Sequence, residues 1–128
     1  MSVTPARPDL AYVNAVRIQP AQLVAELRDL LGARLVAYLG GVKETRAVRQ
    51  WAEGTRRVSA GDLRRLRLAY QAARLLAERD TPAVVQAWFQ GLNPALEDRS
   101  PARVLREGDV DDVGPAVLAA ARQFAAVG

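Results

Sequence analysis

The chain contains no cysteine and no histidine. Without cysteine it has neither a disulfide framework nor a thiolate metal site, and nothing points to secretion. Without histidine it lacks the commonest general base and the commonest metal ligand. The N-terminus lacks the pattern of a signal peptide, and no apolar run approaches the roughly 18 residues of a membrane span. We therefore expect a cytoplasmic protein with no metal, no cofactor and no membrane association.

Aromatic residues make up only 5% of the 128 residues, and a single lysine stands beside 17 arginines. Half of the chain is hydrophobic, mostly alanine, leucine and valine, and this composition predicts an all-α fold. The net charge of +4 is uneven, because residues 1–79 carry +7 and residues 80–128 carry −3. The basic first part could bind phosphate groups, and the acidic second part suggests a different role. The alternative is that the arginines only keep the helix surfaces solvated.

Prolines, glycines and apolar periodicity predict the order of the elements. Residues 1–19 are expected to form a flexible arm with a short strand or turn at 12–18. Ser59 and Asp62 resemble a capping box that starts a long helix, and residues 108–114 are expected to form an acidic loop. Helices are predicted over 20–31, 34–39, 44–53, 60–79, 82–90, 101–107 and 115–126. The long helix would join a helix-turn-helix bundle at 20–79 to a small helical subdomain at 80–128.

The stretch from Leu35 to Gly54 reads as helix, glycine turn and helix, the layout of a DNA-binding helix-turn-helix. Val48 and Trp51 share one face and are assigned to the core. The opposite face carries side chains suited to base edges, namely Thr45, Arg46, Arg49 and Gln50. Flanking cations suited to phosphates are Arg34, Lys43, Arg56 and Arg57. The alternative is that Arg46 and Arg49 only pair with neighbouring glutamates, at about 0.3 kcal/mol.

The run Leu39-Gly40-Gly41-Val42 followed by Thr45, Val48 and Trp51-Ala52-Glu53-Gly54 resembles the Xre, or Cro/repressor-like, helix-turn-helix. That family typically shows leucine-glycine-valine-serine, threonine-valine and tryptophan-glutamate-x-glycine. The chain departs from it by the extra Gly41 and by a Val42-to-Trp51 spacing one residue longer. The resemblance implies binding of double-stranded DNA, and paired units would make the protein a homodimer.

A second run begins with Trp88-Phe89. Adjacent helix positions point about 100° apart, so either one ring is an exposed partner anchor or the final helix covers both. The run continues with Asn93-Pro94-Ala95-Leu96, Ser100-Pro101 and Leu105-Arg106-Glu107-Gly108. In this order the elements resemble the C-terminal toxin-binding domain of the Xre/MbcA/ParS-type antitoxins.

The resemblance implies an antitoxin of a type II toxin–antitoxin system. Such a protein neutralises a RES-domain toxin that consumes NAD, and it represses its own operator, as a dimer or a toxin–antitoxin hetero-oligomer. The positions that carry over as toxin-binding are Trp88, Phe89, Asn93, Pro94, Phe124 and Gly128. Two alternatives stay open: a stand-alone helix-turn-helix transcriptional regulator, and an interaction module whose altered turn has lost DNA binding.

Catalysis is not expected. The acidic side chains Asp109, Asp111 and Asp112 precede a helix, where carboxylates cap N–H groups. No nucleophile–base pair can be assembled without histidine or cysteine, and Gly40-Gly41 lacks the lysine-serine of a phosphate loop. The sequence therefore predicts a binding protein and not an enzyme.

Overall fold

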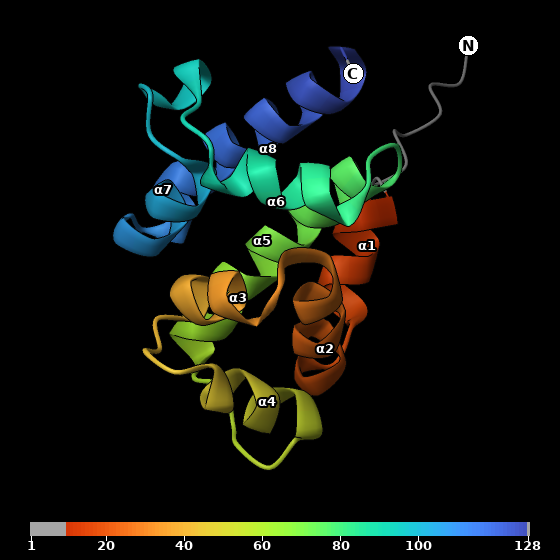
Figure 1. Ribbon diagram of the computed structural model, residues 1–128, viewed down its shortest axis with the longest axis vertical. Coiled ribbons are helices and arrows are strands. Elements are labelled where there is room, and N and C mark those ends of the chain that lie inside the picture. The colour runs from red at the N-terminus through yellow and green to blue at the C-terminus, as the bar shows by residue number, and fades with distance from the viewer. Residues whose placement is uncertain (1–9, 128) are drawn as a thin grey trace, which may run out of the picture.

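The computed structural model describes residues 10–127, and this part of the chain is entirely helical apart from its turns. The all-α prediction is confirmed. Eight α-helices and one 3₁₀ turn follow in the order α1 (Leu10–Arg17), α2 (Pro20–Leu31), α3 (Ala33–Gly40), α4 (Thr45–Glu53), α5 (Ala60–Ala77), α6 (Pro82–Gln90), η1 (Pro94–Leu96), α7 (Pro101–Glu107) and α8 (Val110–Val127). In Figure 1, α5 runs through the middle of the molecule, with α4 at the bottom of the view and α6 and α8 towards the top.

Three helices begin with a hydroxyl cap, and the cap that the sequence predicts at Ser59 is confirmed. The Ser59 hydroxyl accepts the Asp62 N–H at 3.2 Å and opens α5. Thr81 and Ser100 accept an N–H three residues on, and each stands directly before a proline at the first position of α6 or α7. These caps satisfy donors that no helical carbonyl can reach, so α6 and α7 begin at the predicted residues.

The prediction of a loose arm with a strand or turn at 12–18 is wrong for α1. This helix packs Ala11 and Ala15, each 3% exposed, into the core, and it contacts α5. One guanidinium nitrogen of Arg67 donates to the carbonyls of Ala15 and Ile18, at 2.8 Å each, which ties the end of α1 to α5. The contact with Arg67 therefore holds α1 in place, although the residues that α1 buries are small.

The predicted acidic loop at 108–114 is also wrong, because α8 starts at Val110 and Pro115 lies inside it. Asp109 caps this start: its side chain accepts the Asp111 N–H at 2.8 Å, and its carbonyl accepts the N–H groups of Asp112 and Val113. Pro115 costs the helix one hydrogen bond but does not set its beginning.

The long helix α5 connects the two halves of the molecule through one core. It contacts α1, α2 and α3 on one side and α8 on the other. A single cluster of buried side chains includes Leu27, Val48 and Leu66 as well as Phe89 and Val117. No described helix is both long and apolar enough to cross a bilayer.

Candidate nucleic-acid interface and apolar groove

The turn between α3 and α4 uses two adjacent glycines for different reasons. Gly41 has a φ of 76°, and its N–H and that of Val42 close the end of α3 on the carbonyls of Tyr38 and Ala37. This pattern of paired bonds is a Schellman cap, which favours glycine at the left-handed position. Gly40 lies against α4, since a Cβ there would stand 2.7 Å from the indole of Trp51. The second glycine therefore ends α3 while the first permits close packing of α3 on α4.

The two faces of α4 are as the sequence predicts. Ala47, Val48 and Trp51 are buried, which confirms the assignment of Val48 and Trp51 to the core. Thr45, Arg46 and Arg49 are exposed, and Gln50 is half-buried on the same outer side. A helix of nine residues thus presents a polar, basic face to solvent while its other face anchors it.

A hollow of about 730 Å³ opens beside the start of α4, and we call it the basic hollow. It is lined by α3, the following turn, the first residues of α4 and one residue of α7. Its cations are Arg34, Lys43, Arg46 and Arg106, and its other lining residues are Ala37, Tyr38, Val42, Glu44 and Thr45. Four of the eight predicted DNA contacts are therefore brought together here, namely Arg34, Lys43, Thr45 and Arg46.

The remaining predicted cations lie outside the basic hollow. Arg56 borders a smaller neighbouring hollow together with Lys43 and Arg46, and its guanidinium sits 5.9 Å from the centre of the Trp51 ring. Arg49, Gln50 and Arg57 line neither hollow.

The cations around α4 are largely unneutralised. Within residues 10–127, neither a hydrogen bond nor an ion pair involves the side chains of Arg34, Lys43, Arg46 or Arg57. The Arg49–Glu53 contact, at 4.0 Å and largely exposed, is the weakest of the ion pairs. Three arginines elsewhere in the described residues form ion pairs, namely Arg64 with Asp111, Arg65 with Asp62 and Arg103 with Glu107. Positive charge is thus left open on the outer surface of α3 and α4.

Five residues that line the basic hollow are absent from the predicted set, and two of them, Tyr38 and Arg106, contact each other. Tyr38 lies one helical turn after Arg34 on the outer face of α3, so the helical period alone could have predicted its position on that surface. Arg106 lies 68 residues further along the chain, and no local pattern places it there. It donates from Nη1 to the Tyr38 carbonyl at 2.6 Å, and its guanidinium carbon is 4.6 Å from the centre of the Tyr38 ring.

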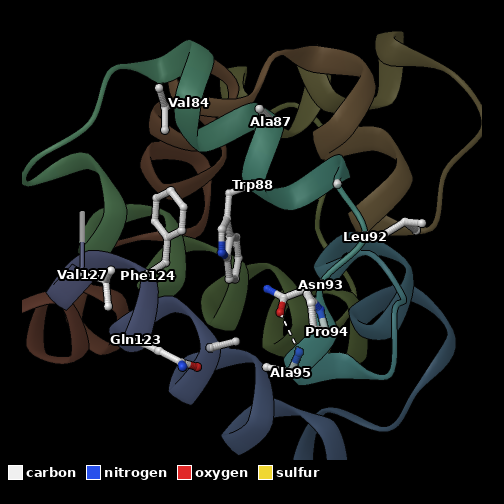
Figure 2. Close-up of a pocket in the computed structure, with 12 residues that line it drawn as sticks. Val84, Ala87, Trp88, Leu92, Asn93, Pro94, Ala95, Gln123, Phe124 and Val127 are labelled. Atoms are coloured by element: carbon white, nitrogen blue, oxygen red, sulfur yellow. Dashed lines mark hydrogen bonds between the residues drawn. The ribbon is translucent and has the colours of Figure 1, made fainter.

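Trp88 and Phe89 are both buried, at 8% and 0% exposure, so neither is a freely exposed anchor. Their rings meet edge to face with centroids 5.1 Å apart. Phe89 belongs wholly to the core. Trp88 projects from α6 towards α8 and forms the floor of an apolar groove (Figure 2).

This apolar groove encloses about 830 Å³ between α6, the segment after it and α8. Figure 2 shows Val84 on the α6 side of the groove, Phe124 and Val127 on the α8 side, and the Trp88 ring between the two helices. Its lining residues are Val84, Ala87, Trp88, Gly91, Leu92, Asn93, Pro94, Ala95, Ala120, Gln123, Phe124 and Val127. Leu92 is 76% exposed and Val127 84% exposed, so apolar side chains stand open at its rim.

The groove brings together four of the six residues predicted to bind a toxin. Asn93 also shapes the fold, because its side-chain oxygen accepts the Ala95 N–H at 2.9 Å. Pro94 and Phe124 are exposed on the rim. Phe89 lies beneath it, and Gly128 lies outside the described residues.

The described residues bring no three metal-binding side chains together. Of the acidic residues before the last helix, Asp109 caps α8 and Asp111 pairs with Arg64. Comparisons of the chain with protein-family models, curated proteins and solved structures found no match.

Proposed function

We propose that α3, its turn and α4 form a DNA-binding helix-turn-helix that places α4 in the major groove. The observation that carries this proposal is the set of unpaired cations around the outer face of α4. Unpaired cations on one side of a helix pair do not contribute to its packing. They would, however, attract the dense row of phosphates that a DNA duplex presents. The close packing of Gly40 on Trp51 would fix the angle at which α4 is presented.

The side chains divide into two roles in this proposal. Thr45, Arg46, Arg49 and Gln50 reach base edges, where arginine pairs with guanine and glutamine with adenine. Arg34, Lys43, Arg56 and Arg57 contact phosphates, which set the register of the protein without reading sequence. Members of both sets, namely Arg34, Lys43, Thr45 and Arg46, line the basic hollow together.

We further propose that the C-terminal half holds a protein partner in the apolar groove. The open apolar rim at Leu92, Phe124 and Val127 supports a macromolecular partner, because aromatic and aliphatic side chains in a hollow are typical interface anchors. Together with the resemblance described above, this makes the chain an antitoxin that represses its own operator and neutralises a RES-domain toxin.

DNA binding is tested by fluorescence anisotropy with a labelled duplex from the chain's own promoter and an unrelated duplex of equal length. We expect binding that weakens steeply with salt, and a preference for the promoter duplex. Arg46→Ala should weaken binding and reduce that preference, whereas Lys43→Ala should weaken binding to both duplexes alike. Arg103→Ala is the matched control, because it removes one arginine that is already paired with Glu107. Equal binding by all four proteins would contradict the proposal.

Partner binding is tested by recovering the tagged protein from its native cells and identifying what stays bound. The wild-type protein should retain a RES-domain protein in stoichiometric amount, and Phe124→Glu should lose it. Ala119→Glu, on an exposed position of α8 outside the groove, should retain it. Recovery of promoter DNA without any protein partner would instead identify a stand-alone transcriptional regulator.

A further inference from the structure

Arg106 is the one residue of the C-terminal half that lines the basic hollow. It is exposed near the end of α7, which packs on α3. It adds a fourth cation to the hollow that Arg34, Lys43 and Arg46 line, and those three all come from the first half. The surface proposed to meet DNA is therefore built from both halves of the chain.

The contacts of Arg106 fix its guanidinium and leave most of its donors free. A guanidinium carries five N–H donors in one plane. One nitrogen donates to the Tyr38 carbonyl, and the guanidinium carbon lies 4.6 Å from the centre of the Tyr38 ring. Because the carbonyl and the ring restrict the side chain beforehand, less rotamer freedom is lost when the remaining N–H groups bind an anion.

The charge of Arg106 is also not neutralised within the described residues. Its neighbour Glu107 is engaged by the Nε of Arg103 through both carboxylate oxygens, at 3.2 Å each. Glu44 is the only acidic residue that lines the basic hollow, against four cations. An anionic group entering the hollow would thus meet a net positive charge.

We infer that Arg106 binds a backbone phosphate of the same duplex that α4 reads, so that the DNA interface extends into the C-terminal half. The inference rests on the proposed DNA binding and adds a contact from α7 to it. Tyr38 acts as the positioning residue, because it holds the guanidinium through its carbonyl and its ring. A phosphate contact of this kind raises affinity for every sequence alike.

The test compares Arg106→Ala with the control Arg103→Ala, which lies on the same helix and removes the same charge. Duplex affinity is measured over a series of salt concentrations. For Arg106→Ala we expect the slope of log K against log salt to fall by about 0.9, the value for one lost phosphate contact. Affinity at low salt should fall about threefold to tenfold, equally for the promoter and the unrelated duplex. Arg103→Ala should match the wild-type protein in both quantities.

Two further variants separate the contact from a general loss of folding. Arg106→Lys keeps the charge without the planar fork, so it should keep the salt slope and lose part of the affinity. Tyr38→Phe preserves the ring and the carbonyl and should bind like the wild-type protein. Tyr38→Ala removes the ring but keeps the carbonyl and the charge of Arg106, so it should keep the salt slope and lose part of the affinity. Thermal unfolding of every variant is recorded beside the binding measurement, and an affinity loss in Arg106→Ala that merely tracks a lower melting temperature would overturn the inference.

The outcomes distinguish this inference from the proposal on which it rests. If Arg46→Ala weakens binding but Arg106→Ala leaves the salt slope unchanged, the Arg106 contact is overturned and DNA binding through α4 stands. If the wild-type protein shows no salt-dependent duplex binding, both are overturned. Replacing chloride by inorganic phosphate at equal ionic strength should leave duplex affinity unchanged. Displacement of the duplex by millimolar phosphate, abolished by Arg106→Ala, would identify a small-anion site and overturn the inference.

Discussion

Replacement of Gly40 by alanine tests how closely α3 and α4 must pack. The added Cβ would stand 2.7 Å and 2.8 Å from two carbons at the edge of the Trp51 ring. Carbon atoms in contact prefer a separation of about 3.5–4.0 Å, so the ring or α3 would have to retreat by about 1 Å. Trp51 is only 2% exposed and belongs to the core, which leaves its ring little room.

The cost is best measured against a second glycine-to-alanine change. Gly61, near the start of α5, has nothing within 4 Å of an added Cβ, so it is the matched control. Both changes gain helix propensity of about 0.5–1 kcal/mol, and this gain cancels in the comparison. The remaining difference is the overpacking at Trp51, about 1–3 kcal/mol. Gly40→Ala should therefore be the less stable variant by this amount.

Urea unfolding followed by circular dichroism measures the difference. With a slope of about 1–3 kcal/mol per molar urea, the two midpoints should differ by about 1 M. Gly40→Ala should also bind the promoter duplex more weakly, since α4 would be displaced from α3. If Gly40→Ala and Gly61→Ala unfold at the same urea concentration, the close contact between Gly40 and Trp51 does not constrain the pair of helices, and the reasoning fails.

Two other side chains lead to further predictions. Arg67→Ala should lower the free energy of unfolding by about 2–3 kcal/mol, because it removes charged hydrogen bonds to the carbonyls of Ala15 and Ile18. Amide hydrogen exchange in this variant should accelerate in α1 before it does so in α8. Burial, followed by the hydrogen bond to Glu26, raises the pKa of Tyr70 above its ordinary value of 10.0. The folded state thus favours the neutral phenol. The stabilisation that Tyr70 adds to the free energy of unfolding is therefore complete below pH 10 and is lost as pH rises through the raised pKa. Urea unfolding between pH 9 and pH 11 should show this loss in the wild-type protein and less of it in Tyr70→Phe.

The sequence predicts well the helices whose start and stop signals lie close to their ends. α2, α6 and α7 begin at prolines and have the predicted bounds, because the signals that start and stop them lie within a few residues. The outer face of α4 likewise follows from helical periodicity around Val48 and Trp51. Such features depend on the order of neighbouring residues alone.

The features that escaped prediction depend on distant contacts or on small residues. α1 buries two alanines, which give a weak hydrophobic period, and Arg67 ties it down from 49 or more residues away. The early start of α8 depends on Asp109 acting as a cap, within a segment whose acidic composition favoured a loop. The meeting of Arg106 with Tyr38 requires α7 to fold onto α3, so no pattern within either helix indicates it.

The central position of α5 has a consequence for the lifetime of the protein. Leu68 of this helix lies against Gly114 of α8, so a chain cut after residue 79 would bare a face that the intact protein covers. Deleting the C-terminal half would destabilise the basic surface as well, and point substitutions are the cleaner way to separate the two proposed activities. In a cell, a protease that opens either half would end both proposed activities together, so the proposed repression and the proposed neutralisation would share a single turnover rate.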